Sequence, residues 1–271
     1  MPASSKLPPR HCYRLCSSMV AILKRFVTGA FELLYGIYAA IVFTVLALLC
    51  LAMILLPLGI DARRAITHWF TRVVFVAIGV RINLQHRERL PLGACVVVAN
   101  HASYLDGIVM KAALPARFSF VIKKEVSRVP LGGLLLHRIG SEFIDRFNRH
   151  AAASDARRLM KVAESGQALV FFPEGTFVEE PGVNKFHSGA FAIAARANLP
   201  VVPVAIQGTR WMLPASRWLP RHGRVTIIVQ PPIGPVTSGD AVSATRDESR
   251  RRILAVVGEP DIASASATSE G

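Results

Sequence analysis

Acidic residues and cysteines are both scarce in this sequence of 271 residues. Its 18 Asp and Glu residues stand against 32 Lys and Arg residues, which gives a formal net charge of +14 at pH 7. Because the chain is also 52% hydrophobic, with a mean hydropathy of +0.39, the charge favours an anionic membrane surface or a phosphate-bearing ligand. The sequence lacks helix-turn-helix, zinc-finger and RNA-binding signatures, so we expect no nucleic acid partner.

The four cysteines do not indicate a disulfide framework. Cys50 lies in an apolar run and Cys95 in a predicted buried strand. Cys12 and Cys16 have C-x-x-x-C spacing, but no second pair of metal ligands follows them. We therefore expect ordinary thiols, no metal site and no bound cofactor.

Residues 33–60 contain no charged side chain. About 20 apolar helical residues cross a hydrocarbon core ~30 Å thick, so this segment predicts a membrane helix. The run is too long for a cleaved signal peptide. Basic residues flank it on both sides, which leaves a single span and a hairpin in one leaflet open. They are Lys6, Arg10, Arg14, Lys24 and Arg25 before the run and Arg63, Arg64 and Arg72 after it.

Pro57 and Gly59 predict a break after this helix. The residues that follow place Trp69 and Phe70 among arginines, which is typical of a helix at headgroup level. The last residues lack the apolar content to fold and are predicted to be disordered. The expected parts are a basic N-terminal segment (1–30), membrane-anchoring helices (31–82), an α/β domain (83–257) and a disordered tail (258–271).

From residue 83 onward, short apolar runs alternate with helical patterns. This alternation predicts an α/β fold, with a mixed, largely parallel sheet flanked by helices. The predicted strands cover 94–100, 118–123, 141–145, 168–173, 200–208 and 225–230. The predicted helices cover 150–165, 187–198 and 247–257.

The stretch VVVANHASYLD places a His and an Asp just after a predicted buried strand. The carboxyl end of a strand is the usual place for a ligand site in an open α/β sheet. A turn into a helix can bring the Asp106 carboxylate to the His101 imidazole, where it fixes the tautomer and favours the imidazolium. The sequence has no G-x-S-x-G elbow and no evident reactive cysteine. His101 is therefore expected to activate a hydroxyl of the substrate itself.

A second predicted strand ends in the residues Pro-Glu-Gly-Thr, 173–176. Gly175 allows a close approach of the backbone, and Thr176 with nearby N–H groups can bind an oxyanion or phosphate. Alone, these residues also fit a tight turn. Together with the His turn, they predict a second polar site at a second strand end.

Four blocks follow one another in a fixed order: NHASYLD, the basic block 120–146, FFPEGT and LPVVPVAIQGT. In their order and spacing they resemble the glycerolipid acyltransferases, and most closely the bacterial 1-acyl-glycerol-3-phosphate acyltransferases. The resemblance implies transfer of an acyl group from a fatty acyl thioester to a glycerol-phosphate hydroxyl.

The resemblance also implies roles for single residues. His101 is similar to the family's general base, and Asp106 would orient it and stabilise its charged form. Arg146 is the best match to a phosphate-binding position, since a guanidinium can grip phosphate bidentately. The substrate-binding residues implied in this way are Glu174, Gly175, Thr176, Arg146, Lys123 and Lys124.

Phe177 departs from the family pattern F-P-E-G-T-R. If the arginine helps to hold the acceptor phosphate, Lys185 or His187 could supply the missing charge. The basic block 123–149 could also suffice alone, or the acceptor could be a different lipid. A lost charge-assisted hydrogen bond is worth ~1.5–3 kcal/mol, which is enough to redirect specificity.

The sequence thus predicts a membrane-bound O-acyltransferase at the cytoplasmic face of a bacterial inner membrane. Acyl-CoA or acyl carrier protein would donate the acyl group to the sn-2 hydroxyl of 1-acyl-glycerol-3-phosphate, forming phosphatidic acid. One rival hypothesis is the same reaction on another lysolipid, and another is a non-catalytic lipid-binding protein of the same fold. The His101 and Asp106 pair favours an enzyme, because lipid binding alone does not require it.

Overall fold

The computed structural model describes residues 10–145, 149–235 and 239–263, with side chains for 23–145, 154–235 and 241–263. The strands are β1 (Arg81–Gln85), β2 (Val96–Ala99), β3 (Ser119–Lys123), β4 (Glu142–Ile144), β5 (Leu169–Phe171), β6 (Val201–Gln207) and β7 (Arg224–Val229). The helices are α1 (Arg10–Leu55), α2 (Ile60–Ala77), α3 (Leu105–Ala113), α4 (Gly132–Arg138), α5 (Arg149–Glu164), α6 (Gly189–Arg196), α7 (Thr209–Met212) and α8 (Gly239–Val257). Short 3-10 helices cover Arg87–Arg89 and Lys124–Arg128.

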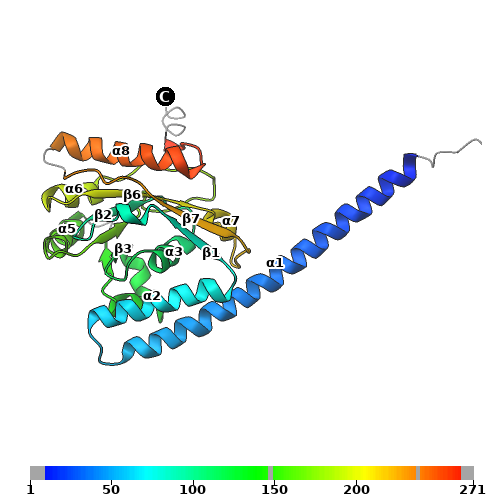
Figure 1. Ribbon diagram of the computed structural model, residues 1–271, viewed down its shortest axis with the longest axis horizontal. Helices are drawn as coiled ribbons and strands as arrows, with labels where there is room; N and C mark the ends of the chain where they lie inside the picture. The colour runs from blue at the N-terminus through cyan, green and yellow to red at the C-terminus, as the bar shows by residue number, and fades with distance from the viewer. Residues whose placement is uncertain (1–9, 146–148, 236–238, 264–271) are drawn as a thin grey trace, which may run out of the picture.

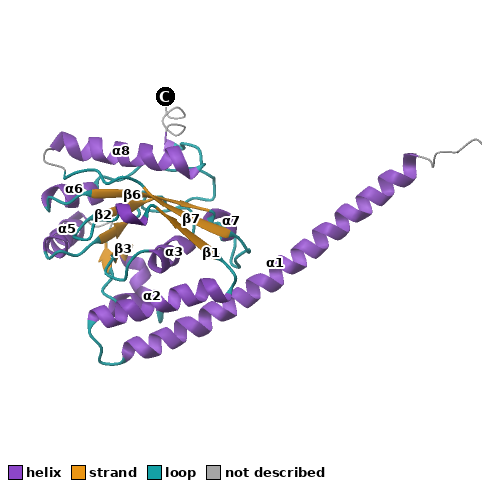
Figure 2. Cartoon of the chain, in the orientation of Figure 1, coloured by secondary structure: helices purple, strands orange, loops and turns teal. Residues whose placement is uncertain are grey.

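Across the described residues, the strands form a seven-stranded sheet in the order β1-β7-β6-β2-β5-β3-β4. Neighbouring strands are parallel except for β6 and β7, which are antiparallel. Helices lie on both sides of the sheet, with α2 and α3 on one side and α5, α6 and α8 on the other (Figure 2). The predicted fold class, a mixed and largely parallel sheet flanked by helices, is confirmed.

The central strand β2 shows why the sheet forms where the sequence predicts it. All four of its residues are buried, as expected for a parallel strand covered on both faces. Val97 and Ala99 belong to the core on the α3 side, whereas Val96 and Val98 pack toward α5, α6 and α8. This alternation follows from the two-residue period of a strand.

The six predicted strands are all present, with ends shifted by one or two residues. The edge strand β1 was not predicted, although the polar and apolar alternation of Arg81–Gln85 is typical of a half-buried strand. It pairs with β7. Helix α4 was also missed, since it begins with two glycines. Helices do not favour glycine in their interior, so propensity gives no signal there.

The helical break predicted at Pro57 and Gly59 is present: α1 ends before it and α2 begins after it. Helix α2 then runs back alongside the C-terminal part of α1 (Figure 1). The Tyr38 hydroxyl of α1 donates a hydrogen bond to the Ala77 carbonyl at the end of α2, over 2.9 Å. The two helices therefore form a hairpin that packs on the α/β domain through α2.

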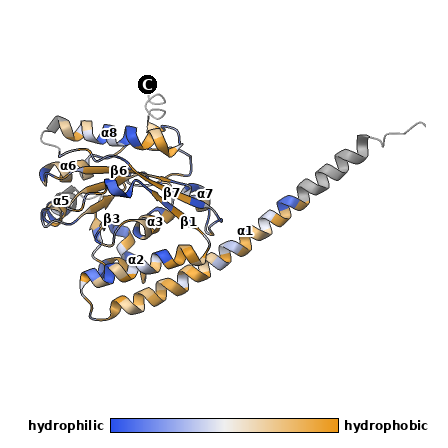
Figure 3. Ribbon diagram, viewed as in Figure 1, coloured by the Kyte–Doolittle hydropathy of each residue, from blue (hydrophilic) through white to orange (hydrophobic). Residues whose placement is uncertain are grey.

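Helix α1 is the one helix of the described chain that is long and apolar enough to cross a membrane, over Leu23–Leu55. Figure 3 shows its apolar character along most of this length. Many of its large apolar side chains are exposed, among them Phe26, Leu34 and Ile41. Helix α1 begins at Arg10, before the predicted boundary at residue 31, and continues across that boundary without interruption. Lys6 and the side chains of Arg10, Cys12, Arg14 and Cys16 lie outside the described part.

The predicted disordered tail begins too early. Glu259 accepts a hydrogen bond from the Arg210 guanidinium at 2.8 Å, and Asp261 pairs with Arg250 at 2.6 Å. Charge pairing with Arg210 and Arg250 therefore holds Glu259 and Asp261 in place, although the apolar content of this segment is low. Residues 264–271 lie outside the described part of the chain.

Arg64 joins the helical hairpin to the α/β domain. It is a buried residue of α2, and its guanidinium donates to the Ile139 carbonyl at 3.0 Å and to the Ser119 hydroxyl at 2.6 Å. Burial lowers its pKa from the usual value. Because a buried cation must be hydrogen-bonded, this contact fixes where α2 meets the sheet.

Replacing Arg64 with Met is expected to lower the free energy of unfolding by about 2–3 kcal/mol, since hydrogen bonds to a charged group are lost and buried acceptors are left unpaired. Denaturant unfolding in detergent measures this change. Arg72→Met is the matched control, because Arg72 is exposed on the same helix. Equal stability of the two variants would contradict the anchoring role.

Candidate active site

The two polar strand ends predicted from the sequence meet at one edge of the sheet. β2 and β5 are parallel neighbours, so their carboxyl ends lie side by side. His101 follows β2, and residues 172–176 follow β5. The structure therefore brings the NHASYLD and FFPEGT blocks together.

His101 and Asp106 form a hydrogen-bonded pair. The His101 Nδ1 lies 2.9 Å from the Asp106 Oδ2, and the same oxygen accepts the main-chain N–H groups of Ala102 at 2.7 Å and Ser103 at 2.8 Å. The Asp106 side chain is fully buried, whereas that of His101 is 21% exposed. An imidazole that donates its Nδ1–H to a carboxylate presents an unprotonated Nε2, which can accept a proton from a ligand.

Glu174 holds the two strand ends together, and its contact with the acceptor stays a prediction. Its Oε1 accepts the main-chain N–H of His101 at 2.7 Å, and its Oε2 accepts that of Asn184 at 2.8 Å. The residue is buried, at 5% exposure. Burial raises its pKa to about 7, against the lowering effect of the two N–H donors. Glu174 thus positions the backbone of His101.

Asn100 was missed by the sequence analysis, although it directly precedes His101. Its buried side-chain amide donates to the Ile206 carbonyl at 3.0 Å, and its Oδ1 accepts the Ile206 N–H at 2.7 Å. The amide thereby extends the pairing of β2 with β6 by one position. The available sequence signal for this role was an Asn placed directly after an apolar strand, where its side chain must find a hydrogen-bond partner.

Aromatic rings enclose the His101 imidazole. The Phe172 ring stacks on it with centroids 4.5 Å apart, and the Phe177 ring meets it edge-on at 4.7 Å. Tyr104 packs against Phe177 in turn, with centroids also 4.7 Å apart. Phe177, which departs from the family motif, is therefore part of the apolar surround of His101.

A cavity of about 580 Å³ opens beside His101, and we call it the His101 cavity. Thr176 and Gly175 line it, and the φ of 81° at Gly175 requires a glycine. Most of its wall is apolar and extends along α3 toward α2 and α4. The apolar lining residues are Ile108, Phe120, Val121, Ile122, Val126, Leu135, Leu136 and Ile139.

The predicted phosphate-binding residues do not all reach this cavity. Lys123 lines it, whereas Lys124 is exposed and lies 3.4 Å from the Asp145 carboxylate. Arg146 lies outside the described residues. Lys185 and His187, the alternatives to an arginine at position 177, are exposed and absent from the lining of the cavity.

Lys111 is a second cation at this cavity, in its deeper part on α3. It is buried, and burial together with the nearby Arg64 lowers its pKa to about 8. Cys50 and Cys95 are buried free thiols, and burial raises the pKa of Cys95 to about 11. No group of three His, Cys, Asp or Glu side chains in the described residues is arranged to hold a metal ion.

Known proteins share both sequence and fold with this chain. The Acyltransferase family model matches residues 81–207. The chloroplastic 1-acyl-sn-glycerol-3-phosphate acyltransferase BAT2 of Brassica napus is 30% identical over 71% of this chain and 57% of its own length. The 1-acyl-sn-glycerol-3-phosphate acyltransferase of Pseudomonas aeruginosa is 30% identical over 60% of this chain and 62% of its own length. The chain thus spans less than two thirds of these relatives.

A solved structure has the same fold. The crystal structure of the 1-acyl-sn-glycerophosphate (LPA) acyltransferase PlsC from Thermotoga maritima matches with a TM-score of 0.70 at 22% identity, over 83% of this chain and 94% of that one. The motif blocks that suggested the family lie within or next to the matched residues 81–207. By its match to the family model, the stretch 81–207 of this chain is an acyltransferase-family domain.

Proposed function

We propose that the protein transfers a fatty acyl group from a thioester, acyl-CoA or acyl carrier protein, to the sn-2 hydroxyl of 1-acyl-glycerol-3-phosphate. The product is phosphatidic acid. The observation that carries this proposal is the His101 and Asp106 pair at an apolar cavity, in a chain with an acyltransferase-family domain. No bound cofactor is required, because the thioester supplies the activated acyl group.

In the proposed reaction, the His101 Nε2 accepts the proton of the acceptor hydroxyl as its oxygen attacks the thioester carbonyl. Asp106 stabilises the imidazolium that forms, as a buried carboxylate does in a Ser-His-Asp triad. Collapse of the tetrahedral intermediate breaks the carbon–sulfur bond, and the imidazolium returns the proton to the leaving thiolate. General-base help of this kind supplies about 10²–10⁴-fold in rate.

The His101 cavity is proposed to hold the acyl chain of the donor. The attacked carbonyl carbon ends that chain, so the chain needs a site that His101 itself lines. An apolar cavity of about 580 Å³ falls within the size of small-molecule sites. Lys123, with Thr176 and Gly175 near the same opening, is the proposed contact for the acceptor phosphate.

The second candidate is the same reaction on a different lysolipid. The packing of Phe177 against His101 and Tyr104 favours it, because no guanidinium is available at that position. Lys123 and Lys111 are then the described lysines that line the cavity. A panel of lysolipids with different headgroups separates the two candidates.

The proposed location is the bacterial inner membrane, with the active site facing the cytoplasm. Support comes from the apolar helix α1 and from the exposed Trp69 on α2, an aromatic residue suited to headgroup depth. Acyl thioesters are cytoplasmic molecules, and the acceptor is a membrane lipid. Anchoring the domain through α1 and α2 would bring both to one site.

Replacing His101 with Ala is expected to lower kcat by about 10²–10⁴-fold, because the hydroxyl loses its base. Product formation from acyl-CoA or acyl carrier protein and lysophosphatidic acid, followed by mass spectrometry in detergent, measures the loss. His86→Asn is the matched control, since His86 is exposed and Asn tolerates its φ of 59°. If wild type and His101→Ala bind lipid equally and neither turns over, the protein is a binding protein instead.

Glu174→Gln is expected to change how stability depends on pH. The folded pKa of about 7 lies above the ordinary 4.5, so the folded state binds more protons between these values. The wild-type free energy of unfolding therefore falls as pH rises from about 4.5 to about 7, by about 2–3 kcal/mol relative to the variant. Denaturant unfolding of both proteins at several pH values measures it. Parallel curves would contradict the raised pKa.

Gly107→Leu is expected to shift donor preference toward shorter acyl chains. Gly107 lines the His101 cavity, and a Cβ built there meets no atom within 4 Å, so a leucine would occupy cavity space without a clash. Displacing two methylene groups, at ~0.8 kcal/mol each, lowers kcat/KM for the longest chains roughly tenfold. A series of acyl-CoA donors measures the shift, and an unchanged profile would place the donor chain elsewhere.

A further inference from the structure

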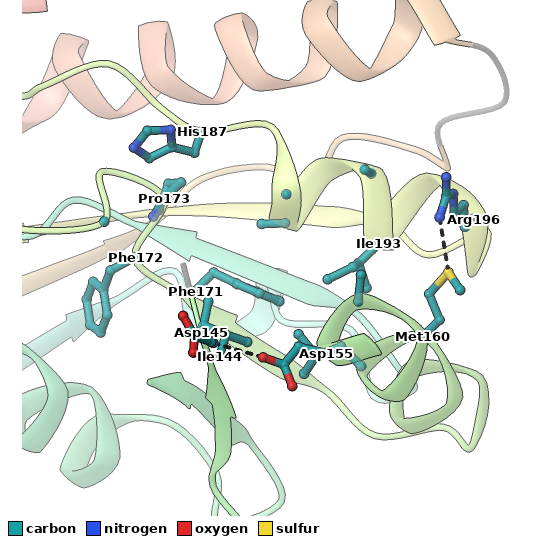
Figure 4. Close-up of a pocket in the computed structure, with 16 residues that line it drawn as sticks. Ile144, Asp145, Asp155, Met160, Phe171, Phe172, Pro173, His187, Ile193 and Arg196 are labelled. Carbon is teal, nitrogen blue, oxygen red and sulfur yellow. Dashed lines mark hydrogen bonds between the residues drawn. The ribbon is translucent and has the colours of Figure 1, made fainter. Parts of the chain in front are cut away.

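A second cavity, of about 390 Å³, lies on the opposite side of the strand β5, between α5 and α6. Its wall is mainly apolar, and Figure 4 shows Phe171, Ile144 and Ile193 among the side chains around it. The mechanism proposed above does not use this cavity. The FFPEGT block contributes its β5 end to the lining, and α5 and α6, which lie outside the family blocks, contribute most of the remainder.

Two charged groups at this cavity, Asp155 and Arg196, contact other parts of the protein, and the exposed His187 also lines it. The Asp155 carboxylate accepts the main-chain N–H of Asp145 at 2.8 Å and the Arg158 guanidinium at 3.0 Å. Arg196 lies 3.8 Å from the Met160 sulfur, away from Phe172 in Figure 4. These side chains are therefore engaged with the protein, and the surface left for a ligand suits a hydrocarbon chain.

The second cavity and the His101 cavity share two lining residues, Phe172 and Gly175. The Phe172 ring is also the one stacked on the His101 imidazole at 4.5 Å. The two cavities therefore share a wall formed by Phe172 and Gly175, next to the proposed base. His101 lines the larger cavity but not the second one.

The proposed reaction involves two hydrocarbon chains. The donor chain starts at the attacked carbonyl carbon, whereas the chain of a lysolipid starts several bonds away from the reacting hydroxyl. The donor chain thus fits the His101 cavity. The acceptor chain fits the second cavity, which is separated from the His101 imidazole by the Phe172 ring. We propose that the second cavity binds the hydrocarbon chain that the acceptor lysolipid already carries. This inference rests on the proposed function.

A rival occupant is the pantetheine arm of the donor. That arm carries two amides and a hydroxyl, which would need hydrogen-bond partners once buried. The wall of the second cavity consists mainly of Ala, Ile, Leu, Met and Phe side chains. Burial of a hydrocarbon chain there gains ~0.8 kcal/mol per methylene and needs no hydrogen-bond partners. The cavity therefore favours the hydrocarbon chain over the pantetheine arm.

The two cavities offer a reciprocal experiment with matched glycine variants. Gly189 lines the second cavity as Gly107 lines the first, and a Cβ at either position meets no atom within 4 Å. Gly189→Leu is expected to lower kcat/KM roughly tenfold for the longest lysophosphatidic acid chains and to leave the donor-length profile unchanged. Gly107→Leu is expected to do the reverse. Gly93→Leu, outside both cavities and equally free of contacts, is the control.

Other outcomes would overturn the inference. If Gly189→Leu leaves the acceptor-length profile of an active enzyme unchanged, the second cavity does not hold that chain. A raised KM for every acyl-CoA, whatever its chain length, would assign the cavity to the pantetheine arm. Failure of the wild type to acylate any lysolipid would instead refute the proposed function, and the two failures are therefore distinguishable.

A second variant covers the case in which Gly189→Leu does not fold. Ala192 also lines the second cavity and is half-buried, so Ala192→Leu narrows it from another position on α6. Thermal unfolding in detergent reports whether each variant is folded. Binding of lysophosphatidic acids of increasing chain length to the folded variant then gives the profile directly, and an unchanged length dependence would again refute the inference.

Discussion

One buried oxygen, the Oδ2 of Asp106, organises the turn at the centre of the site. It lies within hydrogen-bond distance of the His101 imidazole and accepts the main-chain N–H groups of the next two residues. A fully buried carboxylate is costly unless it is hydrogen-bonded, so the turn must close around it. Because Asp106 stands in the first turn of α3, the same contacts fix the start of that helix relative to β2. The orientation of the imidazole and the path of the chain thus have a common cause.

Two further polar side chains extend this anchor to the neighbouring strands. Asn100 pairs with Ile206 of β6, 106 residues away, and Glu174 after β5 accepts the His101 N–H across 73 residues. Each bond is buried or partly buried, where losing one partner costs about 1–3 kcal/mol. The base is consequently held from both sides by strands that the sheet already places in register. Such hydrogen bonds hold the imidazole in one position, as a catalytic site requires.

The sequence predicted the central strands β2, β5 and β6 because they are continuous, buried apolar runs. It predicted the His101 and Asp106 contact because that contact lies within one turn. The role of Glu174 could not be predicted, since a charged residue in a glycine turn is usually exposed and only the tertiary fold buries it. The same limit applies to the tail, where Glu259 pairs with Arg210, 49 residues away in the sequence. Local patterns therefore gave the elements and the chemistry, and long-range polar contacts decided which residues are structural.

The aromatic surround of His101 bears on the choice between water and a lipid hydroxyl. A base at Nε2 does not by itself distinguish the two, and an attack by water would hydrolyse the thioester. Phe172 and Phe177 restrict the space around the imidazole. A hydroxyl that arrives on a hydrocarbon chain gains ~0.8 kcal/mol for each methylene it buries nearby, whereas water gains nothing. In the proposed reaction, binding energy from apolar cavities can thus be used to position the correct hydroxyl. Under this proposal, Phe177 would contribute to selectivity through exclusion of water, and a cation outside this ring cluster, such as Lys123, would contact the phosphate.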